Sequence, residues 1–124
     1  MAKAKSFEEL EIWQKSIDLA IDFYSLVKKE PLSKDYSLCD QIKRAAVSVS
    51  NNIAEGFEYG SNKQFVRFLF IAKGSLGELR SMVFLLDRLK FIEDDLSINL
   101  KTKCTELAKM ISSLIKYLEN HINN

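Results

Sequence analysis

Apolar residues recur at alternating spacings of three and four along four stretches of the chain, at about residues 7–29, 36–55, 62–89 and 95–120. This spacing places one apolar stripe on each of four helices. In the last three stretches the stripes are Cys39, Ile42, Ala46, Val49 and Ile53; then Phe65, Leu69, Ala72, Leu76, Leu79, Val83 and Leu86; then Leu100, Cys104, Leu107, Ile111, Leu114 and Leu118. No long stretch alternates with the period of a strand. The pattern predicts an all-α protein, an up-and-down antiparallel four-helix bundle in a single domain, residues 1–124.

Turn and capping residues separate the four stretches. Ser6 and Glu9 have the spacing of a capping box at the start of the first helix, and Pro31 follows its end. Gly56 is placed to stop the second helix, and Ser61 to cap the third. Because the intervening links are short, neighbouring helices are expected to be antiparallel.

The first helix has two apolar lines about 110° apart, a wider arc than one bundle core requires. One line is Leu10, Trp13, Ile17, Ala20, Tyr24 and Val27, and the other is Ile12, Ser16, Leu19, Phe23 and Leu26. We assign the first line to the core. Ile12, Leu19 and Phe23 of the second line are then predicted to contribute to an interface between subunits.

The third helix has apolar residues in almost every direction. Nearly opposite its core stripe run Phe70, Gly74, Gly77, Ser81 and Phe84. A glycine inside a helix costs about 1 kcal/mol relative to alanine, which suggests that another backbone approaches closely here. We predict that this line forms the interface of a homo-oligomer. The alternative is packing against the second helix of the same chain.

Composition gives the 124-residue chain a net charge of +1, so its overall field attracts neither nucleic acid nor an anionic membrane. Binding to nucleic acid or a partner would need a local patch. The candidate residues are Gln41, Lys43, Arg44, Lys63, Arg67 and Lys73. The alternative is that these lysines are solvated, and that small polar residues such as Ser48 and Asn52 serve close helix packing.

The chain contains few residues of the types that commonly act in catalysis or bind metals. The single histidine, His121, lies near the C-terminus, without the Glu-x-x-His spacing of a di-metal bundle. Cys39 and Cys104 lie on the stripes of different helices and are expected to be buried free thiols. We therefore expect no enzymatic activity, metal or cofactor. Neither a signal peptide nor a membrane-spanning run is seen, so a cytoplasmic protein is expected.

Three segments carry a resemblance to a known family: FEELEIWQKSIDLA at Phe7–Ala20, QIKRAAVSVSNNIAEGF at Gln41–Phe57 and FLFIAKGSLGEL at Phe68–Leu79. They resemble the bacterial four-helix-bundle family of 23S rRNA intervening-sequence proteins. That family also includes the accessory variability protein of diversity-generating retroelements. The resemblance extends over nearly the whole chain.

The resemblance implies a homopentamer without catalytic activity. It also implies, for members of the retroelement type, binding to a reverse transcriptase and to nucleic acid through basic surfaces. Our leading hypothesis is a non-enzymatic homo-oligomer that associates with RNA, DNA or a nucleic-acid enzyme. The alternative is a scaffold that binds only other proteins.

Overall fold

The computed structural model describes residues 4–122, so the outermost residues of the predicted domain lie outside it. Within this range the chain forms four α-helices and two short 3₁₀ helices, and contains no strand. The α-helices are α1 (Glu11–Leu26), α2 (Tyr36–Glu58), α3 (Asn62–Leu89) and α4 (Asp94–Glu119), and the 3₁₀ helices are η1 (Phe7–Glu9) and η2 (Leu32–Lys34).

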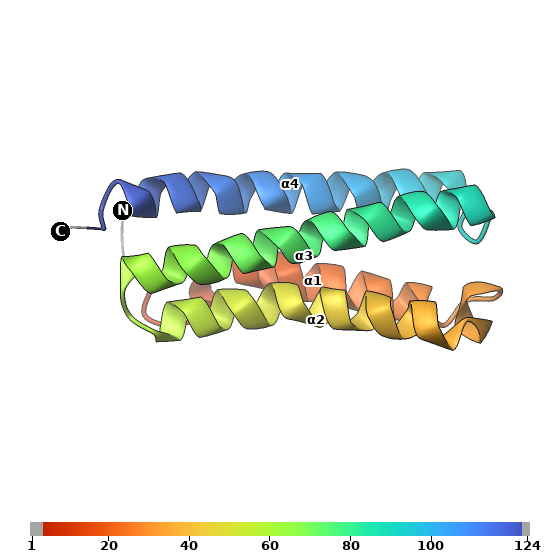
Figure 1. The fold of residues 1–124 in the computed structure, drawn as a ribbon, viewed down its shortest axis with the longest axis horizontal. Coiled ribbons are helices and arrows are strands. Elements are labelled where there is room, and N and C mark those ends of the chain that lie inside the picture. The colour runs from red at the N-terminus through yellow and green to blue at the C-terminus, as the bar shows by residue number, and fades with distance from the viewer. Residues whose placement is uncertain (1–3, 123–124) are drawn as a thin grey trace.

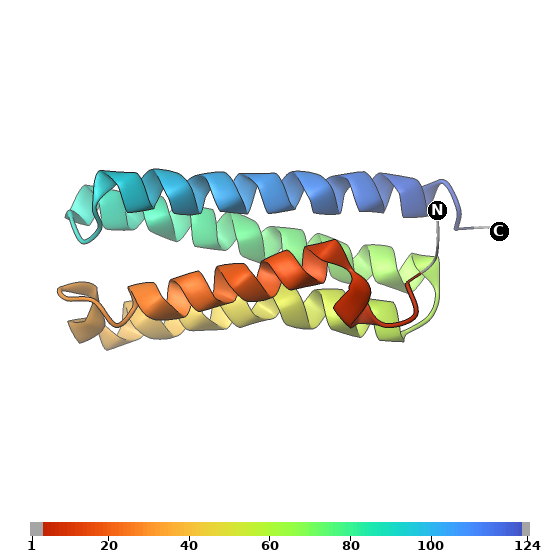
Figure 2. The same cartoon turned by 180° about the vertical axis from the view of Figure 1, so that it is seen from behind.

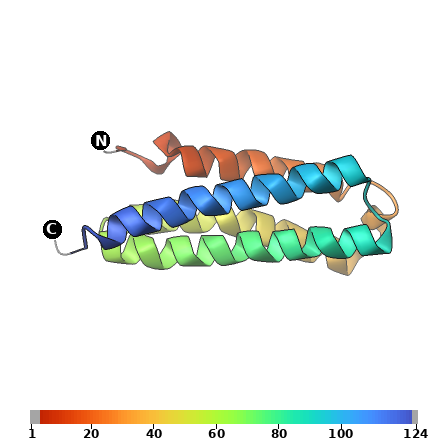
Figure 3. The ribbon, with the colours of Figure 1, turned by 90° about the horizontal axis from the view of Figure 1, so that it is seen from above.

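The helices run up and down in sequence, and each packs mainly against two neighbours (Figure 1). The view from behind shows α1 alongside α2, and the view from above shows α4 crossing between α1 and α3 (Figures 2 and 3). The α2–α3 and α3–α4 pairs have the most extensive contact, and the α1–α4 pair has the least. The predicted antiparallel four-helix bundle is confirmed.

The first helix begins later than predicted. The backbone N–H of Ser6 donates to the Glu9 carboxylate at 3.3 Å, but this capping interaction closes the 3₁₀ turn η1. Leu10 then adopts an extended conformation before α1 starts. The side chains of Asp35 and Ser61 accept the backbone N–H of Leu38 and Gln64, at 3.1 and 3.2 Å, and cap α2 and α3.

Gly56 does not end the second helix, which continues to Glu58. Gly56 is buried against α3, where a Cβ atom would lie 2.7 Å from the Cβ of Phe68 and 3.1 Å from the Phe65 ring. The glycine is therefore needed for close approach of two helices. The turn is made instead by Gly60, whose φ of 80° is accessible to glycine at little cost.

The core confirms the predicted stripes of α2 and α3 in full and that of α4 except for Leu114, which is half-buried. The assignment in α1 was only partly right: Val27 is buried, and Leu10, Trp13 and Ala20 are partly buried against the core, but the second line is the more deeply buried one. Ile12, Leu19 and Phe23 are 6%, 3% and 0% exposed within the single chain, so they are core residues and cannot form a subunit interface. Tyr24, which we had assigned to the core, is 41% exposed.

The buried line of α1 includes Ser16, whose hydroxyl donates to the carbonyl oxygen of Trp13 at 2.6 Å. This local bond satisfies the serine, so it can be buried without a partner on another helix. Cys39 and Cys104 are buried free cysteines, as predicted. Burial raises the pKa of both thiols, that of Cys104 to about 12, which disfavours the reactive thiolate.

Candidate nucleic-acid and partner surfaces

The outward side of α2 carries a shallow hollow of about 570 Å³. Its lining is polar apart from Tyr24 and Val47, and comprises Tyr24, Asp40, Lys43, Arg44, Val47, Ser48, Asn51 and Asn52. Two of the six predicted binding residues, Lys43 and Arg44, thus lie together at one end of this hollow. Gln41 is exposed on the same helix but does not line it.

Ser48 and Asn52 serve packing, as the structural alternative proposed. The Ser75 hydroxyl of α3 donates to the Ser48 hydroxyl at 2.8 Å. The Asn52 amide donates to the carbonyl and hydroxyl oxygens of Ser48, at 2.8 and 3.0 Å. The Ser75–Ser48 bond joins α2 to α3, and the two Asn52 bonds fix the Asn52 side chain against Ser48 within α2.

Lys43 and Arg44 remain accessible. The Lys43 ammonium lies 5.9 Å from the centre of the Tyr24 ring, a cation–π contact between α2 and α1. Arg44 Nε lies 2.9 Å from the Asp40 carboxylate one turn earlier, but the Arg44 side chain is 80% exposed. An ion pair so exposed contributes little to stability. A phosphate could therefore displace Asp40 at small cost.

The structure does not bring the six predicted binding residues into one patch. The Ser48–Ser75 bond sets the register of α2 against α3. Arg44 lies four residues from that level and Arg67 eight residues away in the opposite direction, which separates them by about 18 Å along the bundle at 1.5 Å per residue. Lys63 and Arg67 lie one turn apart at the start of α3.

Lys73 belongs to a third location. It is seven residues before Arg80 and so lies on the same side of α3. Arg80 donates to the Thr105 hydroxyl of α4 at 3.3 Å, which places Lys73 on the α4 side of the helix. Among residues 4–122, neither Lys43, Lys63, Arg67 nor Lys73 forms an ion pair.

The outward line of α3 is exposed along its whole length, as the predicted oligomer interface requires. Phe70 and Phe84 are 50% and 51% exposed, and Ser81 between them is also exposed. A Cβ atom at Gly74 or Gly77 would have nothing within 4 Å. The alternative, packing of this line within the chain, is therefore wrong.

A charged cluster borders this line near the end of α3. The Asp87 carboxylate accepts a hydrogen bond from the Ser97 hydroxyl at 2.6 Å and another from the Lys101 ammonium. These two bonds, the one from Lys101 being the stronger, lower the pKa of Asp87. The Lys101 ammonium also lies 3.9 Å from the centre of the Phe84 ring. The cluster joins α3 to α4 and orients the Phe84 ring.

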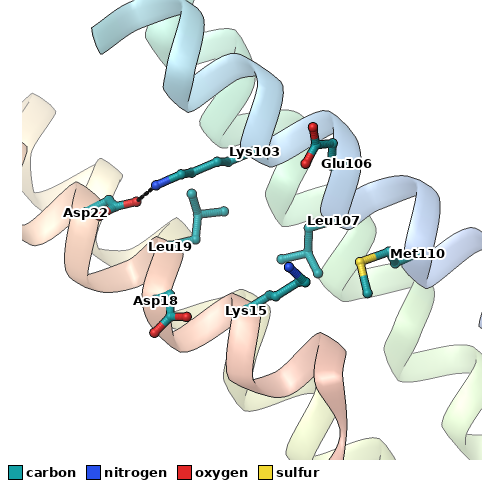
Figure 4. Close-up of a pocket in the computed structure, with 8 residues that line it drawn as sticks. All are labelled: Lys15, Asp18, Leu19, Asp22, Lys103, Glu106, Leu107 and Met110. Atoms are coloured by element: carbon teal, nitrogen blue, oxygen red, sulfur yellow. Dashed lines mark hydrogen bonds and ion pairs between the residues drawn. The ribbon is translucent and has the colours of Figure 1, made fainter.

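A second cavity, of about 220 Å³, lies between α1 and α4 (Figure 4). Its floor is apolar, from Leu19, Leu107 and Met110, and charged residues of both signs surround it: Lys15, Asp18, Asp22, Lys103 and Glu106. Lys103 Nζ crosses the seam to the Asp22 carboxylate at 2.8 Å. In the part of the chain that the structure describes, no three His, Cys, Asp or Glu residues cluster in a way that suits a metal ion.

Sequence reasoning missed several of these features. Asp40 was not recognised as the partner of Arg44, although its spacing of four residues on a helix is a signal for an ion pair. Neither the contact between Tyr24 and Lys43 nor the α1–α4 cavity has such a signal, because both depend on how α1 is rotated. Among the described helices, none combines the length and apolar character that crossing a bilayer requires.

Comparison with known proteins identifies the family. The sequence matches the 23S rRNA-intervening sequence protein family over residues 8–113. This chain belongs to that family. It is also similar to a solved structure from Bacteroides thetaiotaomicron, described as a protein of unknown function from the S23 ribosomal protein family. The two share 27% sequence identity and a TM-score of 0.77, over 85% of this chain and 98% of the other. A comparison with functionally curated proteins gave no match.

Proposed function

We propose that this intervening-sequence protein is a non-enzymatic homo-oligomer that binds RNA or DNA through basic side chains repeated around the assembly. One observation supports the proposal above all: the same chain has an exposed apolar line on α3, with no partner within the chain, and accessible basic side chains elsewhere on α2 and α3. For the number of copies we propose five, from the family resemblance. The family name associates its members with 23S rRNA, which favours RNA as the ligand.

Self-association is supported by the two glycines of α3. Each costs about 1 kcal/mol in a helix interior, and neither relieves a close contact within the chain. Gly56 on α2 is an example of a glycine that allows a neighbouring helix to pack closely, since a Cβ atom at this position would clash with α3. A second copy that seats its backbone between Phe70 and Phe84 would explain Gly74 and Gly77 in the same way.

Nucleic-acid binding is supported by the accessible cations. Lys43 and Arg44 lie at the hollow of α2. Along the bundle, Arg67 lies about 18 Å from Arg44, and Lys63 lies one turn further away. One chain offers too few of them for a strong complex. Repetition in an assembly converts several weak contacts into a multivalent one, whose overall affinity can exceed that of one site by 10²–10⁴.

The test is retention of a labelled RNA hairpin and a single-stranded DNA at about 50 and 200 mM salt, because a phosphate-driven complex weakens steeply over that range. The double variants Lys43→Gln with Arg44→Gln, and Lys63→Gln with Arg67→Gln, are each expected to weaken binding and to reduce the salt slope by about 1–2. The matched control is Lys28→Gln with Lys29→Gln, two exposed lysines outside the candidate groups. No retention of wild-type protein at low salt would contradict the proposal.

The second candidate is a scaffold that binds another polypeptide, such as a reverse transcriptase, without contacting nucleic acid. It is favoured by the net charge of +1 and by the exposed apolar residues of α3. A complex recovered from cells that survives both nuclease treatment and high salt would support it over the first. Loss of the partner on nuclease treatment would support RNA as the link.

A further inference from the structure

An exposed aromatic stack stands at the turn between α2 and α3. Tyr59, the residue that caps the end of α2, is 60% exposed. Its ring lies 5.1 Å from that of Phe68 on α3, with the two planes only 20° apart. Phe68 therefore supports one face of Tyr59, while the large exposed fraction leaves the opposite side of the ring open to a ligand.

The backbone around Tyr59 holds the ring in place. Its N–H donates to the carbonyl oxygen of Glu55 at 3.3 Å, which continues the helical pattern, and Gly60 with φ of 80° turns the chain immediately afterwards. Ser61 then caps α3. Because both ends of this short turn are fixed by hydrogen bonds, the stacked ring is preorganised.

Charged groups of both signs lie near the stack. Lys63 is one residue inside α3, and the guanidinium carbon of Arg67 lies 5.8 Å from the centre of the Phe68 ring. Glu55 and Glu58 on the last turn of α2 offset these two cations. A ligand of this surface must therefore gain more from stacking on the ring than from the charge of its phosphates.

We infer that Tyr59 is a stacking platform for an unpaired base of single-stranded RNA, with Lys63 and Arg67 contacting the adjacent phosphates. This inference rests on the proposed function and adds the form of nucleic acid that this surface takes. Bases inside a duplex are already stacked on each other, whereas an unpaired base offers its face to an aromatic side chain. Such a contact tolerates any base, because every base has a flat π face.

The chain provides a matched control. Tyr36, at the first position of the same helix, is 82% exposed, and no aromatic contact of its ring is found among residues 4–122. Tyr36 and Tyr59 lie at opposite ends of α2 and so at opposite ends of the bundle (Figure 1). Both are exposed tyrosines, but only Tyr59 has a supported ring.

The experiment measures the affinity of full-length protein for a fluorescein-labelled 12-nucleotide single-stranded RNA and for the same sequence as a duplex. Tyr59→Ala is expected to weaken single-strand binding roughly 5- to 100-fold, the range that removal of one base-stacking aromatic produces. Tyr59→Phe should stay within about twofold of wild type, because the ring is kept. Tyr36→Ala and duplex binding by Tyr59→Ala should be unchanged.

Tyr59→Leu guards against a folding defect, since leucine keeps an apolar contact with Phe68 but offers no ring. It should weaken single-strand binding as much as Tyr59→Ala while the helical circular dichroism stays at the wild-type level. Equal single-strand affinities of wild type, Tyr59→Leu and Tyr36→Ala would overturn the platform and leave the proposed function standing. Failure of wild-type protein to bind either RNA would overturn both the platform and RNA as the ligand of the proposed function.

Discussion

The four glycines of the chain occupy three different environments, which shows how much of a residue's meaning depends on its neighbours. Gly56 lies where α2 meets α3 and has no room for a side chain, whereas Gly74 and Gly77 have open space. Gly60 alone requires a positive φ. From sequence, Gly56 is predicted to end the second helix, because a glycine so close to Gly60 is typical of a helix end. The close contact between Gly56 and Phe68 becomes apparent only in three dimensions.

Substitution of Gly56 by alanine is expected to destabilise the fold. The new Cβ would lie 2.7 Å from the Phe68 Cβ, an atom held by the α3 backbone, so the helices must move apart. This overpacking should lower the free energy of unfolding by about 1–3 kcal/mol. Alanine would normally stabilise a helix relative to glycine, so the expected sign is the opposite of that from helix propensity. Urea denaturation measures it. Asn51→Ala, at an exposed position of α2, is the control and should stabilise slightly; an equally stable Gly56→Ala would refute the close approach.

The hydrogen bonds of the Asp87 side chain lead to a second prediction at the residue scale, that the stability of the fold depends on pH. Hydrogen bonds from Lys101 and Ser97 favour its carboxylate, so its pKa in the folded state lies below the unfolded value of about 3.9. The bonds therefore stabilise the fold above about pH 4, and this contribution is lost as the pH falls through the lower, folded pKa.

Asp87→Asn should lower the free energy of unfolding by about 1–2 kcal/mol at pH 7, as expected when a hydrogen bond to a charged group is removed. The difference between variant and wild type should shrink below pH 4, as the pH falls through the lowered pKa of folded Asp87 and the wild-type carboxylate is protonated too. Denaturation curves at pH 7, 4 and 2 test this. A difference that does not change with pH would show that charge at Asp87 is not the cause.

At the scale of helices, the apolar spacing predicted the bounds of three of the four helices closely. The third was expected at residues 62–89 and is observed as Asn62–Leu89. The fourth differs by one residue at each end, and α2 is longer by the turn that contains Gly56. In α1 both lines are apolar, and the buried one contains Ser16, which lowered its apparent apolar character. Only the packing of α1 against the other helices decides which side is inside.

The exposed line of α3 leads to a prediction about assembly. Gly77→Leu places a side chain in the groove between Phe70 and Phe84, where a second copy is proposed to approach. Nothing within 4 Å obstructs the new side chain in the single chain, and leucine favours a helix over glycine by about 0.8 kcal/mol. The variant should therefore remain helical but lose assembly.

Light scattering gives the molar mass, and circular dichroism the helix content. Thr102→Leu, which adds a leucine to an exposed position of α4, is the matched control and should keep the wild-type mass. If Gly77→Leu has the same mass as wild type, another surface must mediate any self-association.

At the scale of the whole molecule, the fold could be predicted from sequence but the candidate site could not. The six predicted binding residues were chosen by type and spacing along two helices, and the structure distributes them over separate locations, with Arg44 and Arg67 about 18 Å apart along the bundle. Their separation follows from the register of α2 against α3, which the Ser48–Ser75 bond and the contact at Gly56 establish. Neither contact can be read from one helix alone.

We therefore propose that the assembly is the functional unit, because basic groups that are too sparse on one chain would be repeated in it. The most direct test is the salt dependence of RNA affinity, measured on wild-type protein and on Gly77→Leu. The variant should bind at least about 10²-fold more weakly, with a shallower slope, although it changes no basic residue. A monomeric Gly77→Leu that binds RNA with the wild-type affinity and slope would contradict the account.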